Sequence, residues 1–276
     1  MEMLGTDKET LSACTLASRQ FTFAASCRLG RHISVNTVRR LQECASLLAA
    51  GGSAFQHVRS LDLGVTTRKP IHQNYWDDYL TILDVFARRR SLTRLWLTEV
   101  PFSSLMRGNR ERARNAIISL TVTVNELGLY SCGFSSYPEM ISLIRSFPLC
   151  TSLYVRDCFV RRTPGQNLFV DLPQHTLHVS DLELTSSPCH KPPVDVSTLP
   201  VDAAIDLSSL TGFSCHMNTA EQARHSIMTA AASPVERFQL MCEEPEGFHG
   251  MSRSSLFANL QYSMTASSSK FWRTQR

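Results

Sequence analysis

Cysteine and histidine are the residues of this chain with the widest chemical range, and each occurs nine times among 276 residues. When clustered, they could hold a metal ion or serve as the nucleophile and base of acyl transfer. The sequence contains no CxxC, HExxH or GxSxG spacing that would mark such a cluster. Cys189-His190 and Cys215-His216 are adjacent pairs, but neighbouring side chains of a strand point to opposite faces. We therefore expect no metal, no cofactor and no enzymatic activity.

Two basic segments are candidates for contact with nucleic acid. The run RGNRERAR spans residues 107–114, but Glu111 interrupts it and no aromatic residue alternates with the arginines. The run ARRRS, at residues 87–91, ends a helical pattern, where cations favour the helix dipole. The net charge of +4 is also small for a dedicated nucleic-acid binder. We interpret both runs as solvated helix surface and expect no nucleic-acid partner.

The composition favours a folded protein of the cell interior. Hydrophobic residues make up 43% of the chain and charged residues 19%, which supplies apolar surface for a sizeable core. No stretch approaches the roughly 18 consecutive apolar residues of a membrane span, and MEMLGTDKET lacks the apolar run of a signal peptide. The odd number of scattered cysteines favours reduced thiols. We expect a cytoplasmic or nuclear protein without a membrane partner.

The elements that position these residues recur along the chain. The pattern apolar-x-x-apolar-x-apolar appears in seven copies that begin about 30 residues apart, a period typical of repeat proteins. The copies are VRSLDL from Val58, LTRLWL from Leu92, VNELGL from Val124, CTSLYV from Cys150, VSDLEL from Val179, LSSLTG from Leu207 and VERFQL from Val235. The last two are the weakest, because Gly212 and Phe238 replace aliphatic residues. Each copy predicts a short strand whose fourth and sixth residues point into the core.

The ninth position of three copies holds a cysteine, at Cys132, Cys158 and Cys215. With this cysteine the pattern resembles the leucine-rich repeat, L-x-x-L-x-L-x-x-N/C-x-L, in its cysteine-bearing form. The resemblance implies that the ninth side chain turns inward where the strand ends, and that Ser131 and Cys132 belong to the frame of the fold. We therefore expect the three cysteines to be buried and structural.

Helical patterns separate the strands. Apolar residues recur at helical spacing within residues 36–52, 74–91, 137–147 and 218–233. Strand, helix and parallel strand in alternation predict an α/β fold, a leucine-rich-repeat solenoid of parallel strands and helices over residues 36–262. Loops are expected at 161–174 and 186–200, and a flexible basic tail at 263–276.

The first 35 residues carry a pattern of their own. Leu11, Cys14, Ala17 and Phe21 form a helical stripe, and a strand-like HISV follows at residues 32–35. The segment resembles the second and third helices of an F-box, particularly in fungal F-box proteins with leucine-rich repeats. The matching positions are Thr10, Leu11, Cys14, Leu16, Arg19, Phe21, Leu29 and Ile33. The Leu-Pro helix that opens an F-box is not found before them, so we expect a truncated F-box-like helical segment.

This resemblance implies a function. An F-box with leucine-rich repeats is a substrate receptor of an SCF-type ubiquitin ligase, so the partners would be a protein substrate and a Skp-type adaptor. Leu11, Cys14, Leu16 and Phe21 would contact the adaptor or pack on the first repeat. The alternative is a stand-alone repeat scaffold in which the helical segment only caps the N-terminal end.

Outward positions of the predicted strands form the expected partner-binding face. The third, fifth and seventh residues of each copy point away from the core. Those with the side chains typical of interfaces are Arg94, Trp96, Tyr130, Tyr154, Arg156 and Glu183. Parallel stacking predicts one row with Trp96, Tyr154 and Glu183, and a neighbouring row with Tyr130 and Arg156.

Overall fold

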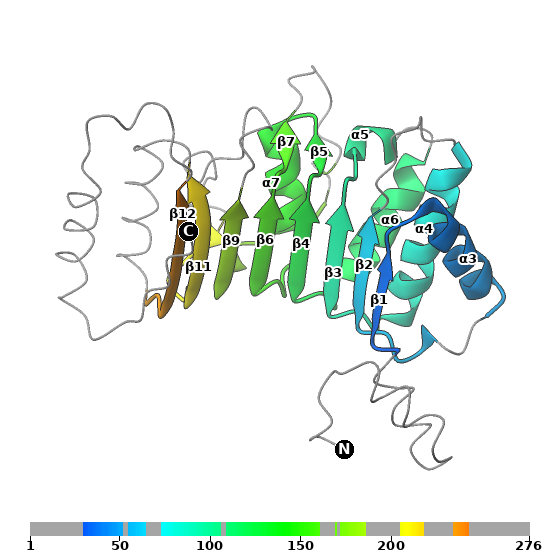
Figure 1. Cartoon of the computed structure of the whole chain (residues 1–276), viewed down its shortest axis with the longest axis horizontal. Helices are drawn as coiled ribbons and strands as arrows, with labels where there is room; N and C mark the ends of the chain where they lie inside the picture. Colours follow the sequence, from blue (N-terminus) through cyan, green and yellow to red (C-terminus); the bar gives the residue numbers. More distant parts are fainter. Residues whose placement is uncertain are drawn as a thin grey trace, which may run out of the picture. The chain divides into compact units, whose positions relative to one another are not determined.

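The computed structural model describes most of the chain from Gly30 onwards. The described residues are 30–51, 55–64, 73–105, 109–160, 169, 172–185, 205–217 and 234–242. The chain divides into two compact units: Met1–Glu99 with Gly108–Val124, and Val100–Arg107 with Asn125–Arg276. Both units have the expected α/β composition with parallel strands (Figure 1).

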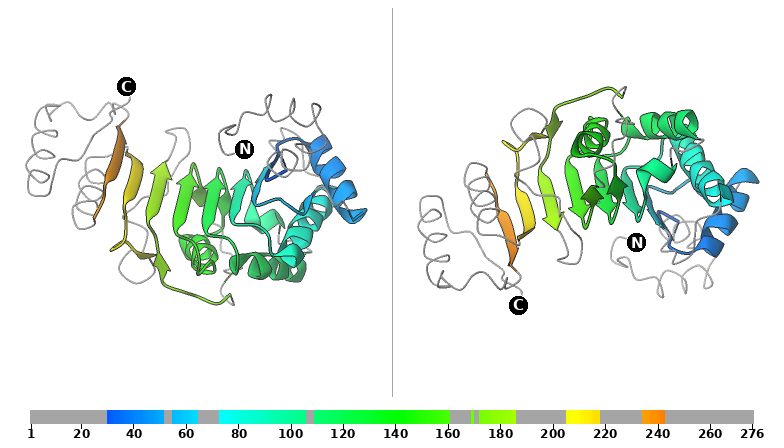
Figure 2. Two further views of the ribbon diagram at one scale, coloured as in Figure 1. Left: turned by 90° about the horizontal axis from the view of Figure 1, so that it is seen from below. Right: turned by 90° about the horizontal axis from the view of Figure 1, so that it is seen from above.

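Among its described residues, the first unit contains three parallel strands and three helices. Strand β1 (His32–Val35) pairs with β2 (Ser60–Gly64), and β2 pairs with β3 (Arg94–Thr98). Helices α3 (Val38–Ala49), α4 (Gln73–Arg89) and α6 (Arg110–Thr121) pack side by side on one face of these strands (Figure 2). The HISV strand therefore belongs to the same sheet as the first repeat copies.

The described part of the second unit contains five parallel strands paired in sequence order. These are β4 (Glu126–Tyr130), β6 (Ser152–Arg156), β9 (Asp181–Thr185), β11 (Gly212–Met217) and β12 (Arg237–Cys242). Short parallel pairs accompany them: β5 (Gly133–Phe134) with β7 (Phe159–Val160), and β8 (Leu177–His178) with β10 (Ile205–Asp206). Helices α5 (Phe102–Leu105) and α7 (Tyr137–Arg145) also belong to this unit.

The repeated apolar pairs form the core, as predicted. The pairs Leu61/Leu63, Leu95/Leu97, Leu127/Leu129, Leu153/Val155 and Leu182/Leu184 are all at most 3% exposed. They lie in register, with Leu61 beside Leu95 in the first unit and Leu127 beside Leu153 in the second. Beyond the ends of β4 and β6, the Phe102 ring stacks on Phe134 at 4.9 Å between centroids. Alternation thus puts every second strand residue into the apolar interior.

Helix starts follow from side-chain caps. Thr37 caps α3 by accepting a hydrogen bond from the backbone N–H of Arg40. Ser136 caps α7 in the same way through Glu139, and the buried Glu139 carboxylate reaches back to the Ser135 N–H at 2.5 Å. This reciprocal arrangement satisfies two otherwise orphaned donors. The helices expected within 36–52, 74–91 and 137–147 are confirmed, whereas residues 218–233 lie outside the described chain.

The register predicted for the sixth copy is wrong. Phe213 pairs with Leu182, and Cys215 with Leu184, so the copy begins at Leu210 rather than Leu207. LSSLTG and LTGFSC both fit the loose pattern, because Leu207 and Leu210 stand three positions apart. Cys215 is therefore a buried strand residue at the sixth position and not the ninth. In this frame Gly212 occupies the third position of the copy, which faces outward, and not the sixth, where an aliphatic residue was expected.

Candidate interaction face

A tight turn follows three of the strands. Glu99, Ser131 and Asp157 directly follow β3, β4 and β6, and their φ angles are 55°, 52° and 51°. Few residues other than glycine, asparagine or aspartate adopt this left-handed conformation, which bends the chain at the end of the strand. The residues that come next are at most 1% exposed: Val100, Cys132 and Cys158. The turn therefore explains why a small buried side chain recurs just after the strand.

Two buried cysteines of the second unit, Cys132 and Cys158, follow the turns after β4 and β6. The Cys158 thiol donates to the carbonyl of Leu129 at 3.4 Å, and the Cys132 thiol to that of Tyr130 at 3.6 Å. Burial raises the pKa of Cys158 well above its ordinary value, and the adjacent Cys132 thiol raises it further. A thiol kept protonated inside the core is a poor nucleophile. The predicted burial of Cys132 and Cys158 is confirmed.

Outward side chains of β4, β6 and β9 make up the strand face of the second unit. Tyr130 and Arg156 are register neighbours, and so are Tyr154 and Glu183. Within this unit the neighbours predicted from the sequence, Tyr130 with Arg156 and Tyr154 with Glu183, are confirmed. Tyr130 is 38% exposed, while Tyr154 is partly exposed.

Two ion pairs fix charged side chains on this face. Arg156 binds Glu183 through two contacts, Nε to Oε1 at 2.7 Å and a terminal nitrogen to Oε2 at 2.8 Å. The pair runs diagonally between the two rows, and its bidentate geometry holds the guanidinium in one orientation. Arg237 pairs with Asp181 at 2.5 Å across the intervening Gly212. A Cβ on Gly212 would collide with the Asp181 carboxylate, so the glycine leaves space for this pair.

Outward side chains of β1, β2 and β3 make up the strand face of the first unit. The Arg94 guanidinium lies 4.9 Å from the centroid of the Trp96 ring, which is a cation–π contact. On the neighbouring strands the Ser34 hydroxyl donates to the Asp62 carboxylate at 3.3 Å. His32 Nδ1 lies 2.9 Å from the Ser60 hydroxyl oxygen. Arg94 and Trp96 therefore lie together in one unit, whereas Tyr130, Tyr154, Arg156 and Glu183 lie together in the other. The F-box-like positions Leu11, Cys14, Leu16 and Phe21 lie outside the described residues.

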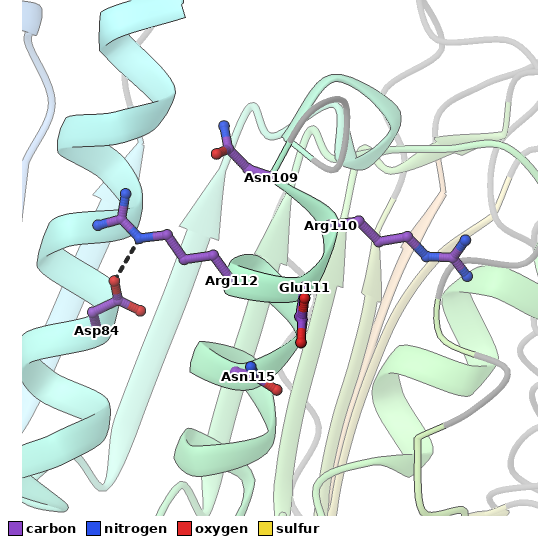
Figure 3. Close-up of a pocket in the computed structure, with 6 residues that line it drawn as sticks. All are labelled: Asp84, Asn109, Arg110, Glu111, Arg112 and Asn115. Atoms are coloured by element: carbon purple, nitrogen blue, oxygen red, sulfur yellow. Dashed lines mark hydrogen bonds and ion pairs between the residues drawn. The ribbon is translucent and has the colours of Figure 1, made fainter.

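One arginine of the basic run at residues 107–114 links two helices. Arg112 of α6 pairs with Asp84 of α4 at 2.7 Å and donates to the Thr81 hydroxyl at 3.0 Å. In the shallow pocket beside them Arg110 points away from this pair (Figure 3). The lining mixes carboxylates, amides and guanidinium groups, namely Asp84, Asn109, Arg110, Glu111, Arg112 and Asn115. This mixture of charges selects no ligand class.

Other chemistry is scarce among the described residues. Within them, no group of three or more His, Cys, Asp or Glu side chains could hold a metal ion. His178 and Asp206 lie 2.8 Å apart in an exposed pair, and hydrogen bonds from Ser208 and then His178 lower the pKa of Asp206. Nor does any helix of the described chain have the length and apolarity needed to cross a bilayer.

Comparison with known proteins identifies no relative. No protein-family model, curated protein or solved structure matches the chain.

The features that sequence reasoning missed are the left-handed turn residues and the Arg237–Asp181 pair. Glu99, Ser131 and Asp157 follow their strands at one fixed position, but they share no residue type that would have marked the turn.

Proposed function

We propose that the chain is a leucine-rich-repeat solenoid that binds another protein through its strand faces and catalyses no reaction of its own. The observation that carries this proposal is the strand face of the second unit, where Glu183 holds Arg156 by an ion pair. Tyr130 lies beside Arg156 and Tyr154 beside Glu183, and both tyrosines are accessible. Tyrosine and arginine are the side chains that most often anchor interfaces. An arginine already fixed by a neighbour loses less conformational entropy on binding than a free one.

The repeat assignment is supported by three features that recur together. The strands pair in sequence order. The fourth and sixth residues of each of the first five copies of the pattern are buried. Strands β3, β4 and β6 each end at a residue in the left-handed conformation, and the residue after it is buried. A solenoid is the architecture in which one supersecondary unit repeats in this way and contacts mainly its neighbours.

The F-box-like resemblance extends the proposal to a substrate receptor of an SCF-type ubiquitin ligase. In this role Leu11, Cys14, Leu16 and Phe21 contact a Skp-type adaptor; in the alternative, a stand-alone scaffold, the chain does not bind the adaptor. A pull-down with purified adaptor separates the two. Retention that is lost in a Leu11→Glu/Phe21→Glu variant supports the receptor, whereas absence of retention supports the scaffold.

The strand faces are tested by alanine substitution. Tyr154→Ala and Trp96→Ala each probe one unit, and Leu149→Ala truncates an apolar side chain that is 52% exposed outside the strands. We expect Tyr154→Ala to lower affinity for a captured and then purified partner by about 10-fold or more, which is about 1.4 kcal/mol. Leu149→Ala leaves the affinity unchanged, and all three variants keep nearly the wild-type melting temperature. Equal affinity of Tyr154→Ala, Trp96→Ala and wild type would contradict binding through these faces.

A further inference from the structure

A groove runs between the C-terminal halves of α3 and α4 in the first unit. It encloses about 520 Å³ and is lined by Leu48, Ala49, Thr81, Val85, Arg88 and Arg89. Leu48 and Val85 are buried and form its floor, while Ala49 and Arg88 are exposed at its rim. From Thr81 to Arg88 the helix rises about 10 Å, at about 1.5 Å per residue, so the groove is about two helical turns long.

The charged side chains that line this groove are both positive, and both lie at its C-terminal end. Its six lining residues include two arginines and no carboxylate. Arg88 uses its Nε to donate to the backbone carbonyl of Asp84 at 3.2 Å, which keeps the stem of the side chain along α4. The nearest carboxylate on α4, Asp84, lies one turn before Arg88 and is paired with Arg112 of α6 at 2.7 Å, whereas Asp77 and Asp78 lie about a turn before Thr81. The groove is therefore apolar along its floor and basic at its C-terminal end.

The arginines have a structural role as well. Arg88 and Arg89 lie in the last turn of α4, where cations offset the partial negative charge of the carbonyl ends. Helix α3 ends beside them without a basic residue in its own last turn. A purely structural role would make the two arginines matter for stability, whereas a docking role would make them matter for binding.

We infer that the groove between α3 and α4 docks an acidic amphipathic helical segment of another protein. An aliphatic side chain of the segment lies over Leu48 and Val85, and a carboxylate about one turn further on pairs with Arg88 and Arg89. A helix laid in an apolar groove presents anchors at i, i+4 and i+7, which matches the length of this groove. This site is separate from the strand faces and does not depend on the function proposed for them.

The experiment measures binding of designed peptides by fluorescence anisotropy. The probe is a labelled peptide of about 16 residues, long enough to form a helix in water, with leucines at i and i+4 and glutamates at one end. The reference peptide has glutamine in place of glutamate. Ala49→Glu blocks the rim without removing a buried group, and Arg88→Glu/Arg89→Glu reverses the basic end. The matched control, Arg39→Glu/Arg40→Glu, makes the same charge change at the other end of α3.

We expect saturable binding of the acidic probe that weakens with added salt and falls about 10-fold or more for the glutamine peptide. Ala49→Glu and Arg88→Glu/Arg89→Glu should each cause a similar loss, while the control stays within about twofold of wild type. Thermal unfolding of each variant separates loss of binding from loss of fold. The inference is overturned if the acidic probe does not saturate, if the glutamine peptide binds equally well, if Ala49→Glu binds like wild type, or if the control loses as much affinity as the groove variants.

Discussion

Replacing Ser131 by glycine should make the protein more stable. Ser131 follows β4 with a φ angle of 52°, and its backbone N–H donates to the carbonyl of Arg156 at 2.8 Å. A residue with a Cβ costs about 1–2 kcal/mol in this left-handed conformation. Glycine removes that cost but loses about 0.5–1 kcal/mol of additional backbone entropy on folding. The difference predicts a net gain of about 0.75 kcal/mol, within a range of about 0–1.5 kcal/mol, and the backbone hydrogen bond is retained.

The assay is urea unfolding followed by fluorescence, with the free energy of unfolding taken from linear extrapolation. Ser131→Val tests the same strain in the other direction, since a β-branched residue tolerates positive φ poorly, and it should destabilise. Ser152→Gly is the matched control, because Ser152 lies in the extended backbone of β6. There glycine brings only its entropic cost, so stability should fall by about 0.5–1 kcal/mol. If Ser131→Gly and Ser152→Gly shift the free energy in the same direction, the account of the turn is wrong.

Three further changes test the packing. Leu127→Ala should lower the free energy of unfolding by about 2–5 kcal/mol, because Leu127 is fully buried and alanine leaves a cavity; a loss below about 1 kcal/mol in urea titration would contradict this. Gly64→Ala should destabilise by about 1–3 kcal/mol, since the new methyl group would meet Thr98 of the paired strand and lie 2.8 Å from its carbonyl oxygen; an unchanged urea midpoint would show that the strands can separate. Iodoacetamide at about pH 8 should leave Cys150 and Cys158 unmodified in the folded protein and modify both in urea, because burial raises the pKa of Cys150 to about 12 and that of Cys158 well above normal; mass spectrometry showing rapid native labelling would refute this.

The core was predictable because its signal is redundant. Each strand places two aliphatic residues at alternating positions, and pairs such as Leu61/Leu63 and Leu127/Leu129 are buried as the alternation requires. The prediction failed where the residues themselves were ambiguous. Leu207 and Leu210 both fit the start of the sixth copy, and only the pairing of Phe213 with Leu182 decides between them. A frame error of three residues moved Cys215 from the strand to the turn.

The sequence predicted which residues of the strand face are register neighbours, but not the ion pairs between their side chains. Register follows from the repeat, so Tyr130 beside Arg156 could be read from spacing alone. The diagonal pair of Arg156 with Glu183 depends on side-chain rotamers, which strand spacing does not determine. The Arg237–Asp181 pair depends on the absence of a side chain at Gly212, a residue first taken for a defect in the pattern. Division into two units also places Arg94 and Trp96 in a different unit from the other predicted anchors.

The pairing of strands in sequence order has a kinetic consequence. Partner residues within the two units are 25–34 positions apart, from Gly212 with Arg237 to Ser60 with Arg94. This separation is about one tenth of the 276-residue chain, so these strand pairings are local in the sequence, and local contacts favour fast folding. Each closure of a loop of about 30 residues costs about 3 kcal/mol of chain entropy, and every step costs nearly the same. A newly synthesised strand can therefore join the sheet as soon as its predecessor is in place, without waiting for a distant part of the chain.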